Sequence, residues 1–159
     1  MVIFGGKEGD GRKKFTNDVH ILDLEKSYWL KNLKIEGAPP VDRMGHSACL
    51  YNDQFIVIYA GWNGIRVLDD VYYLKIALPC NEISLQNNFT SYSVAFEMEW
   101  QLIKTDGASP KRQFHTANVL EREMFVFGGG DGKSWLNELH SFDLGSYSFP
   151  LNFSNICCH

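Results

Sequence analysis

The segment Met124-Phe125-Val126-Phe127-Gly128-Gly129-Gly130 decides the fold of this 159-residue chain. It is a short apolar run, rich in aromatic residues, that ends in glycines. Because the run is too short for a typical helix, we interpret it as a buried strand. Glycines at the end of a strand indicate backbone with positive φ, or a neighbour that presses where a Cβ would not fit.

Near-copies of this run occur at residues 1–6 and 55–62. Each copy is followed by a polar turn and then by a second strand-like segment, at residues 17–24, 69–76 and 137–144. The order of segments recurs at a period near the ~50 residues of one known repeat architecture. A repeat of this kind determines the fold more firmly than any single strand does.

The cycle contains two further types of strand. Trp29 and Trp100 each lie in an aromatic segment that precedes a proline-containing break. Segments with the pattern Arg-x-x-His-Ser/Thr-Ala begin at Arg43 and Arg112 and precede the next glycine-ended run. The second cycle is longer because of an insertion at residues 77–97, which we expect to be an exposed loop.

These residues together resemble kelch repeats. The resemblance covers nearly all of residues 1–144, although Ala60 replaces a doublet glycine and no tryptophan follows Leu144. It rests on the Arg-x-x-His strands, on the two tryptophans, on the Asn/Asp-Asp/Glu-Val/Leu strands, and on the glycine doublet after each apolar strand. The doublet positions are Gly5-Gly6, Ala60-Gly61 and Gly128-Gly129.

The resemblance implies an all-β chain that forms an incomplete kelch β-propeller of four-stranded antiparallel blades. Strand a contains the Arg-x-x-His pattern, strand b is the glycine-ended run, strand c follows, and strand d contains the tryptophan. We expect about eleven strands and negligible helix. The predicted divisions are a partial blade at residues 1–42 (strands b–d), a blade at 43–104, a blade at 105–144 (strands a–c) and a divergent C-terminal tail at 145–159.

The phase of the repeats predicts that the chain is a piece of a larger ring. Propellers are built from four to eight blades, so we expect a longer protein, a truncated product or one piece of an assembly. In the tail, Tyr147 and Phe149 alternate as in a strand, but Pro150 argues against a long one. Either a divergent strand d or an altered transcript end would explain it.

The charge composition gives no support for two classes of partner. With 15 Lys+Arg against 19 Asp+Glu, the net charge is −4, which favours neither a nucleic acid nor an anionic membrane as a partner. The sequence contains no apolar stretch long enough for a transmembrane helix. We expect no signal peptide, because the first residues form a strand-like run without a basic flank or a cleavage site. We expect a reduced, cytoplasmic chain, with the nucleus as a second possible location.

Most of the distinctive residues have a structural interpretation. His46 and His115 recur at one repeat position, as do Trp29 and Trp100, so we expect packing and hydrogen-bonding roles. We expect no catalytic residues and no cofactor, since no known catalytic motif is present. The C-terminal Cys157-Cys158-His159 sequence could coordinate a metal ion. Structural metal sites usually need four well-spaced ligands, so we expect no metal.

The loops between strands b and c, and the segments that lead into strand a, are the candidate binding surface. In kelch propellers they line the mouth of the channel, where partner peptides dock, and tryptophan and arginine are enriched at binding hot spots. Arg43 and Arg112 contact a partner or make structural hydrogen bonds, and the sequence leaves both open. The candidate partner-binding residues are Arg12, Arg43, Trp62, Asn63, Arg66, Arg112, Asp131 and Trp135.

Two classes of function stay open. The favoured class is a non-catalytic interaction module that presents loops to a protein partner as a scaffold or a ligase-substrate adaptor. The alternative is part of a propeller enzyme acting on a sugar or another small metabolite, which would need a convergent acid/base or metal cluster. Self-association through open blade edges is a further expectation.

Overall fold

The computed structural model describes residues 1–9, 14–31, 33–76, 80–86, 89–95, 97–106, 108–146 and 148–153; residues 80–86, 89–95 and 148–153 are described by backbone only. These ranges contain strands and no helix, so the predicted all-β class is confirmed. Accordingly, they include no helix with the length and hydropathy of a membrane span. The strands are β1 (Val2–Glu8), β2 (Lys14–Asp23), β3 (Tyr28–Trp29), β4 (Ile35–Glu36), β5 (Ser47–Tyr51), β6 (Phe55–Trp62), β7 (Val67–Ile76), β8 (Cys80–Gln86), β9 (Phe89–Ala95), β10 (Met98–Ile103), β11 (Thr116–Leu120), β12 (Glu123–Phe127), β13 (Leu139–Asp143) and β14 (Ser148–Phe153).

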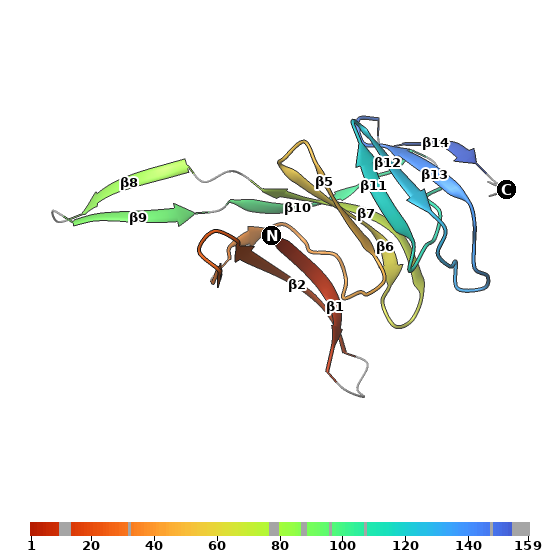
Figure 1. Ribbon diagram of the computed structural model, residues 1–159, viewed down its shortest axis with the longest axis horizontal. Coiled ribbons are helices and arrows are strands. Elements are labelled where there is room, and N and C mark those ends of the chain that lie inside the picture. The colour runs from red at the N-terminus through yellow and green to blue at the C-terminus, as the bar shows by residue number, and fades with distance from the viewer. Residues whose placement is uncertain are drawn as a thin grey trace.

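Three of the four sheets in the described part of the chain are blades that fan out side by side, and the fourth is the two-stranded sheet of β8 and β9 (Figure 1). The first blade is β1-β2-β3, the middle blade is β5-β6-β7-β10 with β4 added, and the third blade is β11-β12-β13-β14. Apart from β4, neighbouring strands within each blade are antiparallel. This is the predicted kelch arrangement of strands a to d, with the first blade starting at strand b.

Strand β4 was not predicted. It runs parallel to β10, with Met98 paired to Ile35, and so adds a fifth strand to the outer edge of the middle blade. The chain then turns at Gly37, whose φ is +80°. A Cβ built there would lie 2.3 Å from the carbonyl oxygen of Trp100, so the linker can approach the outer strand this closely only with glycine.

The insertion is more regular than the exposed loop expected from sequence. It does lie between strands c and d of the middle blade, β7 and β10, as predicted, but it contains β8 and β9, which pair as an antiparallel hairpin from Cys80–Ala95 to Gln86–Phe89. In Figure 1 this hairpin extends away from the three blades. The expectation of a loop was therefore wrong for these two segments.

The third blade has a fourth strand where the sequence indicated a divergent tail. β14 pairs antiparallel with β13, so a strand d is present in residues 148–153 and the blade does not end at residue 144. The register shifts between Ser141, opposite Leu151, and Asp143, opposite Ser148. Pro150 falls within this irregularity of an edge strand, which is where a sheet tolerates proline.

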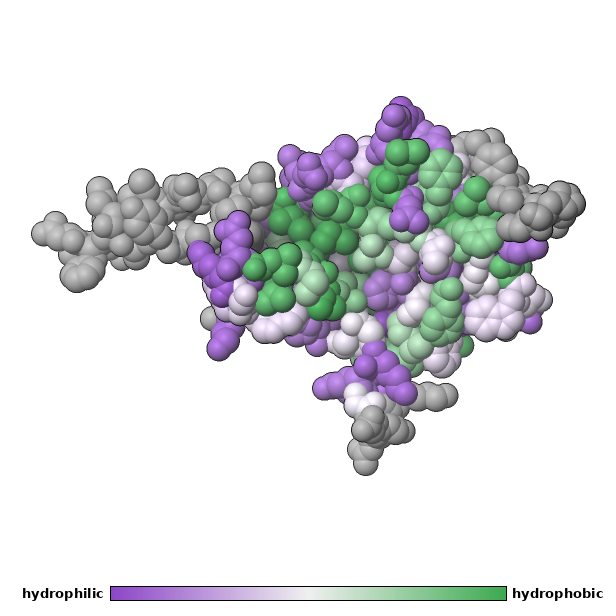
Figure 2. All heavy atoms as spheres, viewed as in Figure 1, coloured by the Kyte–Doolittle hydropathy of each residue, from purple (hydrophilic) through white to green (hydrophobic). Residues whose placement is uncertain are grey.

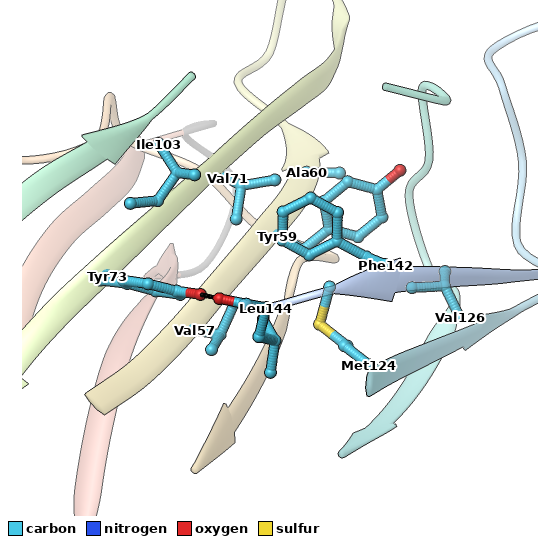
Figure 3. Close-up of a cluster of buried hydrophobic side chains, with 10 residues drawn as sticks. All are labelled: Val57, Tyr59, Ala60, Val71, Tyr73, Ile103, Met124, Val126, Phe142 and Leu144. Atoms are coloured by element: carbon cyan, nitrogen blue, oxygen red, sulfur yellow. Dashed lines mark hydrogen bonds between the residues drawn. The ribbon is translucent and has the colours of Figure 1, made fainter. Parts of the chain in front are cut away.

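The core lies between the blades. Successive side chains of a strand point to opposite faces, so on β6 Val57 and Tyr59 face the third blade while Ile58 faces the first. Figure 3 shows the cluster between the middle and third blades, where the Tyr73 hydroxyl donates a 3.1 Å hydrogen bond to the carbonyl oxygen of Leu144. Its buried members are Val57, Tyr59, Ala60, Val71, Tyr73, Ile103, Met124, Val126, Phe142 and Leu144.

A second cluster joins the first and middle blades. Phe4 lies edge-on to Trp100, with 5.1 Å between ring centroids. The middle blade is therefore covered on both faces, and each outer blade on one. The buried members of this second cluster are Phe4, Ile21, Ile58, Leu74, Met98 and Trp100.

Candidate functional site

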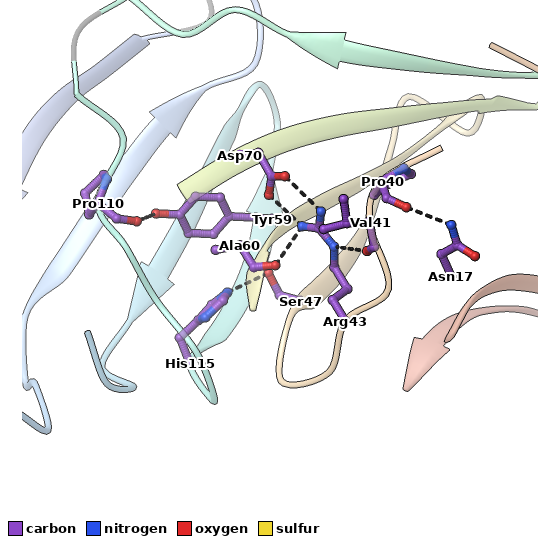
Figure 4. Close-up of polar contacts among 10 residues, drawn as sticks. All are labelled: Asn17, Pro40, Val41, Arg43, Ser47, Tyr59, Ala60, Asp70, Pro110 and His115. Carbon is purple, nitrogen blue, oxygen red and sulfur yellow. Dashed lines mark hydrogen bonds and ion pairs between the residues drawn. The ribbon is translucent and has the colours of Figure 1, made fainter. Parts of the chain in front are cut away.

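Arg43 is a structural residue of the middle blade. Its guanidinium group is fully buried and forms a two-pronged ion pair with Asp70, with Nη1–Oδ1 and Nη2–Oδ2 distances of 2.6 and 2.8 Å. Nη1 also donates to the Ala60 carbonyl and Nε to the Val41 carbonyl (Figure 4). The side chain is thus inaccessible to a partner, and the structural alternative holds for it.

Arg112 has the equivalent place in the third blade. Its Nη2 lies 2.7 Å from Glu138 Oε2 and 2.6 Å from His140 Nε2, and the side chain is buried. The contact with His140 and the Arg112 charge both lower the pKa of Glu138, which keeps the carboxylate ionised. Of the two alternatives left open for Arg112, its burial and its ion pair therefore favour the structural one, as for Arg43.

The backbone of both arginines joins neighbouring blades. The Gly6 N–H donates to the Arg43 carbonyl and the Gly61 N–H to the Arg112 carbonyl, each at 2.8 Å. In return, the Arg43 N–H donates to the Thr16 carbonyl at 3.3 Å. The Arg112 N–H donates in the same way to the carbonyl of Leu68, which is the residue equivalent to Thr16. These bonds set how the segments leading into strand a sit against the preceding blade.

The glycine doublets have the geometry that their position in the repeat predicts. Gly5, Ala60 and Gly128 have φ of +62°, +56° and +64°. At the second position, a Cβ on Gly129 would lie 2.5 Å from the Gln113 carbonyl oxygen, and one on Gly61 would lie 2.8 Å from a carbonyl of the equivalent segment. The doublet is therefore the point where strand b meets the start of strand a, and Gly6 occupies the same position in the first blade.

The two tryptophans of strand d differ in burial. Trp100 is 5% exposed and packs in the second cluster, as predicted, whereas Trp29 is 47% exposed. The prediction of a buried Trp29 is therefore wrong. Trp29 lies on a face of the first blade that no other described blade covers. His20 lies edge-on to Trp29, 6.2 Å away.

The two b–c loops described in full are built in the same way. In the middle blade, Asn63 Oδ1 accepts hydrogen bonds from the N–H groups of Ile65 and Arg66. In the third blade, Asp131 Oδ1 accepts equivalent bonds from Lys133 and Ser134 at 2.8 Å, and these bonds lower the pKa of its carboxyl group. Both side chains shape their own turn, so they are poor candidates for direct contact with a partner.

The remaining sequence candidates lie at the same end of the blades. Trp62 is half-buried and stacks edge-on against Phe15 of the first blade at 5.4 Å. Arg66 is exposed, and Trp135 is 79% exposed. Arg12 lies outside the described residues, as does the Cys157-Cys158-His159 sequence. In the described part of the chain, no group of three or more His, Cys, Asp or Glu side chains could hold a metal ion.

An open groove of about 530 Å³ lies between the middle and third blades at this end. The b–c loop of the middle blade forms one wall, with Trp62, Ile65 and Arg66. The segment that leads into strand a of the third blade and the b–c loop of that blade form the rest. Figure 2 shows hydrophobic residues (green) over much of the viewed face, interspersed with hydrophilic residues (purple) that also lie along its margins.

Of the ten described residues that line the groove, only Trp62, Arg66 and Asp131 were sequence candidates. The omitted lining residues include Ile65, Lys111, Phe114 and Lys133. Phe114 has φ of +56° at the repeat position where the middle blade has Gly45, with φ of +64°. An alignment of the two Arg-x-x-His segments would have shown that phenylalanine replaces glycine at this position. A positive φ is unusual for such a bulky residue.

Comparison with known proteins gives one family. A model of the KLHDC2/KLHL20/DRC7 Kelch-repeats domain matches residues 1–91, more than half of the chain. Acyl-CoA-binding domain-containing protein 5 of Arabidopsis thaliana is 28% identical over 135 residues, 84% of this chain and 17% of that protein. Adagio protein 3 of Arabidopsis thaliana is 28% identical over 149 residues, 91% of this chain and 21% of that protein.

A human relative matches to a similar extent. Leucine-zipper-like transcriptional regulator 1 of Homo sapiens is 29% identical over 172 residues, 82% of this chain and 20% of that protein. The chain therefore spans about a fifth of the length of these curated relatives. The family match agrees with the repeat geometry of the doublets, arginines and blades, and this chain belongs to the KLHDC2/KLHL20/DRC7 Kelch-repeats domain family.

Proposed function

We propose that this chain is a non-catalytic protein-interaction module, acting as a scaffold or adaptor. The partner docks on the end of the blades where the b–c loops meet the segments that lead into strand a. The observation that carries the proposal is the exposure of large apolar side chains there, with Trp135 79% and Ile65 90% exposed beside a groove. Exposed apolar side chains that lie together and are rimmed by polar residues mark interaction sites.

The kelch family and its relatives support an interaction role. The named relatives carry different descriptions and the match covers 17–21% of each, as expected if this part is a module within longer proteins. A protein fits the site better than a nucleic acid does, because the chain carries a net charge of −4 and nucleic-acid binders are usually basic.

Site-specific photo-crosslinking tests the proposal. A benzophenone amino acid in place of Trp135 is expected to crosslink to a protein partner in an extract of the source cells. The matched control carries the same group in place of Glu121, an exposed residue in the turn between β11 and β12 at the other end of the blade. Crosslinking of one protein from position 135 and not from position 121 would support the proposal.

The opposite pattern would contradict it. Equal crosslinking from both positions, or from position 121 alone, would place the contact surface elsewhere. Turnover of a sugar or another small metabolite by the purified chain would favour the enzymatic alternative, for which the groove would have to supply the reacting groups.

A further inference from the structure

The backbone of Phe114 is held in a conformation that suits glycine. Its φ is +56°, and its N–H donates a 2.8 Å hydrogen bond to the carbonyl oxygen of Gly45. A glycine would adopt this φ without strain, as Gly45 does with a φ of +64° at the equivalent position. The phenylalanine therefore costs stability, and strained residues of this kind cluster at binding and catalytic sites.

The Phe114 side chain does not offset this strain by packing in the core. It is 50% exposed and belongs to neither buried cluster. Its ring lies over Gly45, where a Cβ would be 3.0 Å from the ring, and beside Trp135, with 6.5 Å between the centroids. Phe114 and Ile65 line the groove and Trp135 lies beside Phe114, and we call these three solvent-exposed side chains the apolar ledge.

Positive charge surrounds this ledge. Arg66, Lys111 and Lys133 line the groove, all three are exposed, and none of them forms an ion pair with any described residue. The one anionic residue among the described residues of the lining is Asp131. The hydrogen bonds that its carboxylate accepts from loop N–H groups lower its pKa, so it stays ionised. Three cations against one anion leave the groove positive on a chain whose net charge is −4.

We propose that this groove binds an extended acidic peptide with one large apolar side chain, which packs on Phe114 and Trp135 while flanking carboxylates meet Arg66, Lys111 and Lys133. The inference rests on the proposed interaction function and adds the chemistry of the partner. Apolar anchors surrounded by complementary charge are the usual composition of a peptide site, with the anchor supplying affinity and the charge supplying orientation. A single-stranded nucleic acid also combines negative charge with stacking bases, but the acidity of the whole chain disfavours it.

Fluorescence anisotropy with labelled peptides and the full 159-residue chain tests this chemistry. The probe is a short peptide with a central phenylalanine flanked by glutamates. The comparison probes replace the phenylalanine with serine, replace the glutamates with lysines, or are a single-stranded oligonucleotide of similar charge. The acidic apolar peptide is expected to bind at least about tenfold more tightly than each comparison probe, and less tightly as salt is added.

Variants of the chain separate binding from folding. Phe114→Gly removes the ring and also relieves the strained φ, so it is expected to weaken peptide binding at least about tenfold without lowering the melting temperature. The pair Lys111→Glu with Lys133→Glu is expected to weaken binding and to reduce its salt dependence. The matched controls are Leu120→Ser and Lys26→Glu, at exposed positions away from the groove.

Each outcome decides the proposal. Unchanged affinity in Phe114→Gly or in the charge-reversed pair, tighter binding of the lysine peptide, or preferential binding of the oligonucleotide would overturn it. If the acidic peptide fails while crosslinking from position 135 still captures a protein, the interaction function stands and only the assigned partner chemistry is wrong.

Discussion

Burial changes the acid–base chemistry of the two histidines that begin strand a. His46 lies edge-on to Phe4 and His115 edge-on to Tyr59, each with 5.2 Å between centroids. Burial first, and then the charge of the nearby arginine, lowers the pKa of each histidine from 6.5 to about 4. Nδ1 of each ring has no hydrogen-bond partner among the described residues, so an added proton would find no acceptor.

Stability is therefore expected to fall as the solution is acidified. The unfolded chain binds protons on these histidines near pH 6.5, and the folded chain does so near pH 4, so the free energy of unfolding decreases through this interval. The limit is about 3 kcal/mol per histidine. Urea denaturation between about pH 7 and about pH 5 measures the slope above the range where most carboxyl groups titrate.

A double variant assigns the slope to these two residues. His46→Gln with His115→Gln is expected to flatten the dependence of stability on pH, while His20→Gln, at an exposed position, keeps it. A slope that persists in the double variant would show that other groups control it.

The two arginines illustrate what sequence can and cannot predict for a single residue. Their recurrence at Arg43 and Arg112 predicted an important role, and their place at the start of strand a was right. The side chain points inward because it pairs with an acidic residue, Asp70 for Arg43 and Glu138 for Arg112. Each acidic partner lies far from its arginine in the sequence. Pairing across strands, which no local pattern encodes, decides this point.

At the scale of elements, the second glycine of the doublet in the middle and third blades controls how strand b passes the start of strand a. Gly61→Ala is expected to destabilise the chain by about 1–2 kcal/mol more than Gly6→Ala does. Both variants strain a positive φ, +101° and +117°. Only Gly61 has an atom 2.8 Å from the added Cβ, while Gly6 has nothing within 4 Å.

Urea denaturation of both variants measures this difference in the free energy of unfolding. Equal losses of stability would mean that backbone strain alone matters at the doublet. That result would contradict the close approach between strand b and the start of strand a.

The strands that the sequence failed to predict share one property, which is that they lie at edges or outside the repeat. β14 is an edge strand with an irregular register, so Pro150 could be accommodated although it argued against a strand. The β8–β9 hairpin had a sequence signal, since Ile83 and Leu85 alternate with polar residues, as do Tyr92 and Val94. Comparison with the shorter first cycle hid that signal, because an insertion has no counterpart to align.

At the scale of the whole molecule, the repeat predicted how the blades stack but not the state of the outer faces. The face of the first blade turned away from the middle blade has Ile3 41% and Trp29 47% exposed. The equivalent residues of the middle blade, Ile58 and Trp100, are 0% and 5% exposed because the first blade covers them. The same side chains thus serve as core or as surface, according to whether a neighbouring blade is present.

This difference predicts that the 159-residue chain associates with itself. On the third blade, Phe127 is 44% exposed on the face equivalent to the one that Tyr59 occupies in the covered middle blade. The first-blade face of one copy can therefore pack against the third-blade face of another, and such head-to-tail contacts propagate unless they close into a ring.

Light scattering is expected to give a mass that rises with concentration. Ile3→Lys with Trp29→Lys should reduce that rise, because two charges would be buried in the contact, while Leu50→Lys, at an exposed position on β5, should not. A monodisperse monomer with a sharp melt, or equal association of all variants, would contradict the prediction.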